Sequence, residues 1–322
     1  VGSEMCIRDS AYTEYKGKIQ NWGYIANLSL NRFYYSQRDN HSERYGFQPS
    51  LLVSYNPVDN LHFRYHINLK NNAPSIAYLN DVEQRIDILQ TRRGNPDLKS
   101  FRSTIQDFNA IFSTGIFSID ALVSYTYEKN PIMESVIYEE GMFIHTYENQ
   151  KSFQHLAVEV TFKIKPWKDH ISLSVTPGIN RYISTGNNYL HTYTLKELRI
   201  NLDASYKNWL LSFMTITPPN RYVYGEQLLK GDLMHTLMIG YKQPAWSIMA
   251  GIHNPFMKTY RSENANWSAL NPVKSDIHST NMSNTIVVKL NFNLNFGRQY
   301  KGANKGIQNI DTDSGILQGT KE

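Results

Sequence analysis

The chain has 322 residues, with 33 Lys and Arg against 28 Asp and Glu, a formal net charge of +5 and a mean hydropathy of -0.48. This small excess of positive charge is spread along the chain and gives no indication of nucleic-acid binding. No run of about 18 apolar residues occurs, so the sequence predicts no transmembrane helix. A single cysteine excludes a disulfide scaffold and a metal site built from several cysteines.

The first ten residues, VGSEMCIRDS, have no apolar period, no hydrophobic region and no cleavage pattern, so they are not a signal peptide. They resemble read-through from a vector or adapter. We therefore assign residues 1–10, which include Cys6, to an artefactual leader. We expect the native N-terminal part to be missing, so the lack of a signal peptide gives no information about location.

Alternation of apolar and polar residues predicts strands along the rest of the chain. In residues 61–70 the two kinds of side chain alternate without exception, and nearly the same regularity occurs in 117–128, 156–165 and 286–296. Weaker alternation covers residues 11–19, 22–37, 46–56, 101–113, 170–182, 191–206, 209–217, 233–243 and 246–253. We expect about thirteen strands and no helix, because no segment keeps a 3.6-residue apolar period.

The connections between these strands are expected to alternate between short and long. Short turns are predicted at 20–21, 58–60, 114–115, 166–169, 207–208 and 243–244, and long polar segments at 38–45, 71–100, 129–150, 183–190, 218–232 and 254–283. Short periplasmic turns and long extracellular loops are typical of an outer-membrane barrel. Aromatic residues also gather near strand ends, as at Trp167, Tyr206 and Trp209, which is typical of interfacial girdles.

Alternation alone also fits a soluble β-domain with an enzymatic or binding role, because any half-buried antiparallel sheet produces it. The connection lengths and the aromatic residues favour the membrane barrel.

Four segments carry a family resemblance. Residues 91–99, TRRGNPDLK, resemble the GNPDLKPE segment of TonB-dependent outer-membrane receptors, and residues 72–80, NAPSIAYLN, are similar to their RPSxxxLNP segment. Residues 287–298, VVKLNFNLNFGR, and 309–321, NIDTDSGILQGTK, resemble the end of the related outer membrane protein beta-barrel family. The sequence departs from the receptor pattern at Ser100-Phe101, which stand in place of Pro-Glu. Read alone, residues 94–97 also fit an ordinary β-turn.

The resemblance implies an all-β, antiparallel transmembrane β-barrel in the outer membrane. It would be incomplete, with about thirteen strands of a larger barrel in residues 11–297, followed by a flexible polar tail in residues 298–322. The implied function is uptake of an unidentified small ligand, with the plug and the TonB-binding segment in the missing N-terminal part. The implied partners are outer-membrane lipid, the TonB complex, the ligand and a surface lipoprotein. The alternative is a barrel with an assembly, adhesion or structural role and no TonB coupling.

The polar sides of the strands would line the lumen of such a barrel. The predicted lining residues are His62, Arg64, His66, Lys70, Asp120, Glu159, Lys163, Lys289 and Asn291. Recognition residues concentrate on loops carried by a rigid scaffold. The residues predicted to contact the ligand are Arg92, Arg93, Tyr260, Arg261, Trp267 and His278.

The sequence gives no indication of catalysis. None of the common catalytic or phosphate-binding motifs occurs. His62 and His66 share a strand face but lie about 13 Å apart by strand rise, too far to bind one metal. We therefore predict no catalytic residue, no metal site and no cofactor.

Overall fold

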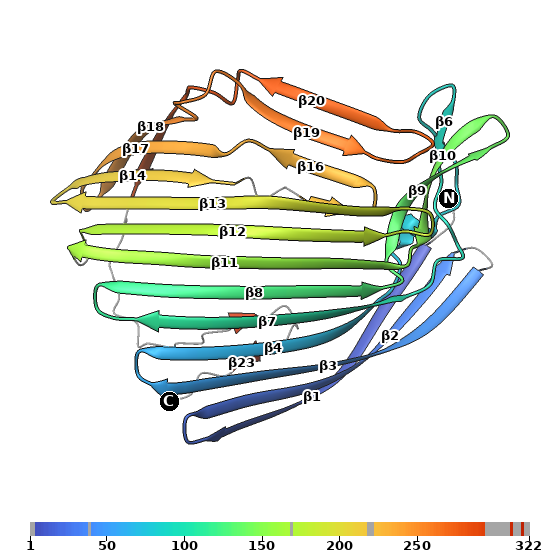
Figure 1. Cartoon of the computed structure of the whole chain (residues 1–322), viewed down its shortest axis with the longest axis horizontal. Coiled ribbons are helices and arrows are strands. Elements are labelled where there is room, and N and C mark those ends of the chain that lie inside the picture. The colour runs from blue at the N-terminus through green and yellow to red at the C-terminus, as the bar shows by residue number, and fades with distance from the viewer. Residues whose placement is uncertain are drawn as a thin grey trace.

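The computed structural model describes residues 4–37, 40–167, 170–217, 222–293, 310–311 and 317–318. Thirteen strands form one antiparallel sheet in which each strand pairs with the next one of the sheet along the chain (Figure 1). They are β1 (Glu4–Ile19), β2 (Trp22–Gln37), β3 (Asn40–Val58), β4 (Leu61–Asn72), β7 (Phe101–Ser113), β8 (Phe117–Lys129), β11 (Ser152–Trp167), β12 (Ile171–Thr185), β13 (Leu190–Tyr206), β14 (Trp209–Ile216), β17 (Met234–Lys242), β18 (Trp246–His253) and β21 (Thr285–Phe292). The predicted all-β fold and its thirteen strands are confirmed.

The sheet is a curved, open wall. Its order begins with β1 and ends with β21, and in the described part of the chain these two strands do not pair with each other. The described helices include none that is long and apolar enough to cross a membrane. The open edge agrees with the predicted incomplete barrel.

Two smaller sheets are built from the long connections. One has the order β5 (Gln84–Arg85), β6 (Gln90–Arg92), β10 (Met142–Asn149) and β9 (Ile132–Glu139), with β6 and β10 parallel. The other has the order β15 (Tyr222–Tyr224), β16 (Gln227–Gly231), β19 (Tyr260–Asn266) and β20 (Val273–Ser279). We call them the first and the second loop sheet. Both lie toward the same end of the large sheet, opposite the short turns (Figure 1).

The prediction of no helix is wrong by one turn, α1 (Ile76–Leu79). The Ser75 hydroxyl accepts a hydrogen bond from the Tyr78 N–H at 3.3 Å, which caps this turn. Four residues are too few to show a helical period.

The predicted long connections at 38–45 and 183–190 are also wrong. Strands β2 and β3 are separated only by residues 38–39, and β12 and β13 only by residues 186–189. Backbone pairing needs no apolar pattern, so the strands continue after their alternation ends.

The large sheet begins before residue 11, the predicted start of the barrel. Strand β1 includes residues 4–10, which pair with residues 31–37 of β2. The leader assignment for residues 1–10 stays a prediction. The predicted tail, residues 298–322, lies outside the described residues, apart from the short strands β22 (Ile310–Asp311) and β23 (Leu317–Gln318).

The pairing register sorts the side chains of the large sheet onto two faces. Directly paired residues of antiparallel strands project to the same side. One such row joins Phe108, Val123, Val158 and Ile179 across β7, β8, β11 and β12. The adjacent row, one residue along each strand, joins Asp107, Ser124, Ala157 and Asn180. We call these the apolar face and the polar face.

The apolar face carries a band of hydrophobic side chains of nearly constant height. In β11, β12 and β13 its positions run through residues 156–164, 171–179 and 198–206, which is about nine residues in each strand and suits a tilted membrane crossing. Many of these side chains are exposed, for example Phe162 at 44%. The same face becomes polar at Gln154, Arg181 and Lys196, so the band ends there.

An aromatic girdle follows the edge of this band at the short turns. Trp22 stacks on Tyr55 with ring centroids 4.3 Å apart. Farther along the sheet, Tyr241 contacts Trp209 at 5.1 Å and Trp246 at 5.9 Å. Rings with a polar edge prefer a membrane interface, and the girdle therefore marks one boundary of the crossing.

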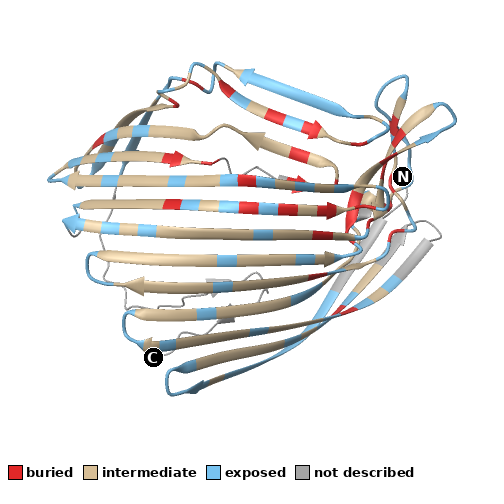
Figure 2. Cartoon of the chain, viewed as in Figure 1, coloured by how far each residue is buried: buried red, intermediate tan, exposed pale blue. Residues whose placement is uncertain are grey.

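The buried core lies at the opposite end of the strands, where the loop sheets meet the large sheet (Figure 2). One cluster joins Phe153, Tyr182 and Leu195 of β11, β12 and β13 to buried residues of the loops. These loop residues are Met133, Val223, Leu228 and Ala265. A second cluster contains Leu79, Leu98 and Ile132. The loops are thus packed onto the polar face instead of extending freely into solvent.

Gly94, in the segment GNPDLK, lies against the backbone of the preceding helical turn. Its N–H donates to the Asn80 carbonyl at 2.7 Å, and the next N–H, of Asn95, donates to the Tyr78 carbonyl at 2.6 Å. Leu98 is 1% exposed in the second cluster. This segment therefore anchors the first long loop, which gives a physical reason for its glycine.

We expect Gly94→Ala to loosen this loop. An added Cβ would lie 2.5 Å from both the Asn80 and the Tyr78 carbonyl oxygens, which are backbone atoms and cannot move alone. The expected cost is about 1–3 kcal/mol, as for other overpacked sites. Limited proteolysis should cleave within residues 73–100 faster than in the parent protein. Gly115→Ala is the control, because nothing lies within 4 Å of its added Cβ, and equal protection of both variants would contradict the account.

Candidate functional site: the polar face of the sheet

All nine residues that the sequence predicts to line the lumen lie on the polar face. The register connects Arg64, Asn109, Leu122 and Glu159 in one row, and His66 and Asp107 begin the next. Near the other edge, Lys289 pairs with Met249, and Asn291 with Ser247. The predicted common face is thus present, and their role as lining residues stays a prediction.

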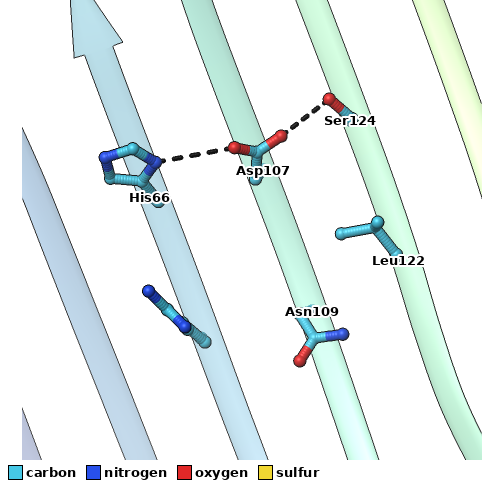
Figure 3. A pocket seen from close by; sticks show the side chains of 6 residues that line it. His66, Asp107, Asn109, Leu122 and Ser124 are labelled. Atoms are coloured by element: carbon cyan, nitrogen blue, oxygen red, sulfur yellow. Dashed lines mark hydrogen bonds and ion pairs between the residues drawn. The ribbon is translucent and has the colours of Figure 1, made fainter. Parts of the chain in front are cut away.

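A cavity of ≈ 390 Å³ lies on this face between β4, β7 and β8. Its lining residues are Arg64, His66, Asp107, Asn109, Leu122 and Ser124. The Asp107 carboxylate accepts a hydrogen bond from the Ser124 hydroxyl at 2.6 Å, and its other oxygen lies 3.5 Å from His66 Nδ1 (Figure 3). Asn109 donates to Asp120, which is another predicted lining residue.

Arg64 is the one basic residue of this cavity besides His66, and no side chain in the described part of the chain forms an ion pair with it. The neighbouring polar groups are already bonded to one another. The cavity wall therefore presents a guanidinium that has no ion-pair partner among the described residues.

This arrangement does not have the geometry of nucleophilic catalysis. A serine nucleophile needs a base within hydrogen-bond reach, with a third group that orients the base. Here Ser124 and His66 both contact the carboxylate of Asp107, so the imidazole does not face the hydroxyl. Within the described residues, no group of three or more His, Cys, Asp or Glu side chains is arranged to hold a metal ion.

The predicted ligand-contacting residues lie in the two loop sheets. Arg92 is exposed, whereas Arg93 pairs with Glu83 at 3.3 Å and Glu139 at 2.7 Å. In the second loop sheet, Arg261 pairs with Asp276 at 2.9 Å. The guanidinium groups of Arg93 and Arg261 thus support loop structure, and their contact with a ligand stays a prediction.

The other three predicted loop residues have different surroundings. Tyr260 is 7% exposed, while His278 lies on the exposed strand β20. Trp267 packs over β13, with its ring 5.7 Å from Tyr193 and 5.2 Å from His191. Trp267 is therefore a predicted ligand residue whose ring contacts side chains of the polar face.

A polar contact joins the two loop sheets. The Asn271 amide donates to Gln90 Oε1 at 3.1 Å, although the two residues are 181 positions apart in the chain. His145 of β10 lies 2.9 Å from the same Gln90 oxygen and 3.3 Å from Glu134. The loops from distant parts of the sheet thus meet one another above the polar face.

Sequence reasoning missed Asp107, Asn109 and Ser124, which complete the cavity. All three lie in segments where the sequence predicts strands, residues 101–113 and 117–128. The two-residue alternation of residues 101–113 puts Asp107 and Asn109 on one face of their strand, and the pairing with β4 makes this the face of His66. The sequence does not indicate the buried cluster of the loops, which includes Met133 and Leu228, because the loop strands are short and their apolar and polar residues do not alternate.

Burial raises the pKa of Glu226, in the turn between β15 and β16, and the negative charges of Glu134 and Glu148 raise it further. The folded loop therefore binds this proton more tightly than the unfolded loop does. Stability is lost as the pH rises from the ordinary glutamate value of 4.5 through the raised value.

We expect Glu226→Gln to remove this pH dependence and to stabilise the loop at neutral pH. Hydrogen exchange of residues 222–231, measured in acid and at neutral pH, is the test. Glu140→Gln, at an exposed turn, is the matched control. Faster exchange in Glu226→Gln than in the parent at neutral pH would contradict the prediction.

Comparisons with known proteins agree with this architecture. The family model described as "Outer membrane protein beta-barrel family" matches residues 8–222. Among curated proteins, no sequence matches the chain.

Several solved structures share the fold. The FrpB iron transporter from Neisseria meningitidis (F5-1 variant) has a TM-score of 0.66 at 9% identity, over 90% of this chain and 46% of that one. For the copper transporter OprC the TM-score is 0.63 at 13% identity, over 90% and 48%. For the siderophore receptor PirA from Pseudomonas aeruginosa it is 0.56 at 14% identity, over 91% and 58%.

The chain spans about half the length of these solved structures. At such identities the likeness shows the fold, which is the barrel portion of outer-membrane receptors and transporters. The family match covers most of the chain and shows its membership and its location in the outer membrane. The chain belongs to the outer membrane protein beta-barrel family.

Proposed function

We propose that the chain forms part of the wall of an outer-membrane transporter that takes up a small polar ligand. The observation that carries this proposal is the separation of the two faces. One face presents a hydrophobic band to lipid, and the other carries the charged side chains and a cavity of ≈ 390 Å³. A wall with these two faces separates lipid from a water-filled passage.

The loops support the same proposal. They pack onto one end of the polar face and meet one another through Asn271, Gln90 and His145. A ligand that enters the passage would therefore first meet loop residues such as Trp267, whose ring contacts Tyr193 and His191 of the wall. The similar solved structures are an iron transporter, a copper transporter and a siderophore receptor, and they support a transport role over an enzymatic one.

We further propose that uptake is coupled to TonB through a part of the protein outside this chain, as the GNPDLK segment suggests. The gene would be deleted and restored in its own host. Accumulation would then be measured for ferric siderophores, cobalamin, oligosaccharides and peptides, with and without a protonophore.

Accumulation of one class that needs both the gene and the proton gradient would support the proposal. Uptake that needs the gene but persists with the protonophore would contradict TonB coupling. Unchanged uptake of all four classes would favour the structural or adhesive role.

A further inference from the structure

In six neighbouring strands of the large sheet, the acidic side chains are confined to one face. In β4, β7, β8, β11, β12 and β13, the described apolar-face positions carry no acidic side chain, whereas the acidic residues all lie on the polar face. These acidic residues are Asp107, Asp120, Glu128, Glu159, Glu197 and Asp203. The apolar face of the same six strands carries four cations, Arg102, Lys129, Arg181 and Lys196.

All four cations lie at the end of the hydrophobic band nearest the loops. Lys129 is two residues beyond Tyr127, which is about 7 Å along the strand. The opposite end of the band carries the aromatic girdle. Since long loops are extracellular in this fold, the cations lie at the level of the outer-leaflet headgroups.

Arg102 and Lys129 are directly paired across β7 and β8. Like charges that face each other across a strand pair destabilise the pairing. Both side chains are exposed, and neither has an ion-pair partner within the described part of the chain. An anion bound between them would remove the repulsion.

Arg32 of β2 shows the contrasting case on the same face. It also lies just beyond the hydrophobic band, but it forms an ion pair with Glu43. The protein therefore neutralises one cation of this edge internally and leaves the Arg102–Lys129 pair open.

We propose that Arg102 and Lys129 bind a phosphate group of an outer-leaflet lipid. A guanidinium binds phosphate oxygens in bidentate fashion, and an ammonium adds a point charge from the neighbouring strand. The acyl chains of the same lipid would pack against the hydrophobic band below, on Tyr127 and Phe108. This site concerns the lipid side of the wall, so it does not depend on transport.

The test uses the protein purified from its own outer membrane in mild detergent and stripped of bound lipid. Native mass spectrometry would measure binding of phosphorylated lipid A, of the same lipid without its phosphates, and of inorganic phosphate. Each basic residue near an anionic membrane surface contributes about a fivefold gain in affinity. The double variant Arg102→Gln/Lys129→Gln should therefore bind phosphorylated lipid A about 30-fold more weakly.

Arg32→Gln is the matched control and should bind the lipid as the parent does. The pair Arg102→Lys/Lys129→Arg keeps both charges and should retain most of the binding, which separates loss of charge from misfolding. Equal binding by the double variant, or equal binding of the dephosphorylated lipid, would overturn the proposal. Displacement of the lipid by millimolar inorganic phosphate would assign the site to free phosphate and would also overturn it.

Discussion

Val158→Arg should prevent most of the protein from assembling in the outer membrane. Val158 lies inside the hydrophobic band, two residues from its centre at Val160, and pairs with Val123 on one side and Ile179 on the other. An arginine on the lipid side near mid-membrane costs about 2–4 kcal/mol. The amount of heat-modifiable, protease-resistant protein in outer-membrane fractions measures the effect.

Ala157→Arg is the control for this substitution. Ala157 is the preceding residue and lies on the polar face between Ser124 and Asn180. An added guanidinium there can reach water, so assembly should be close to that of the parent. If both variants assembled equally well, the apolar face would not be in contact with lipid.

Leu228→Ala should release the loop sheets from the wall while the wall itself remains assembled. Leu228 is 2% exposed and pairs with Val223 and Ala265, which belong to the same buried cluster. Truncating a buried leucine to alanine costs about 2–5 kcal/mol through lost contacts and a residual cavity. We expect faster hydrogen exchange and proteolysis in residues 222–231 and 260–279, with unchanged exchange in β11.

Leu270→Ala provides the comparison within the same loop, because Leu270 is exposed and lies outside the cluster. Its loop should keep the protection of the parent. If Leu228→Ala exposed the strands of the large sheet as much as the loops, the two would form one cooperative unit, contrary to this account.

The strands of the large sheet could be predicted closely from the sequence. Residues 22–37 and 101–113 were predicted with the bounds that β2 and β7 have in the structure. The reason is physical: one side of each strand contacts lipid or the membrane interface, and the other contacts water, so the alternation is imposed along its whole crossing. The same alternation placed all nine predicted lining residues on one face.

The loops could not be predicted in this way, because their packing does not depend on a period. Strand β19 has the sequence YRSENAN and pairs with β16 and β20 through its backbone. The contact between Asn271 and Gln90 joins residues 181 positions apart, and no local pattern indicates it. The burial of Leu98 and Leu228 depends on which loops pack together, because their clusters join residues from separate parts of the chain.

If the large sheet separates lipid from water, successive side chains of one strand should face lipid and water in turn. Single cysteines would be placed from residue 156 to residue 164 of β11 after replacing Cys6, the one cysteine of the sequence. A spin label would be attached to each cysteine. Its relaxation would be measured with oxygen, which concentrates in lipid, and with a water-soluble nickel complex. Accessibility should alternate, with residues 156, 158, 160, 162 and 164 exposed to lipid and the residues between them exposed to water. Equal access of the nickel complex to all nine positions would contradict the account.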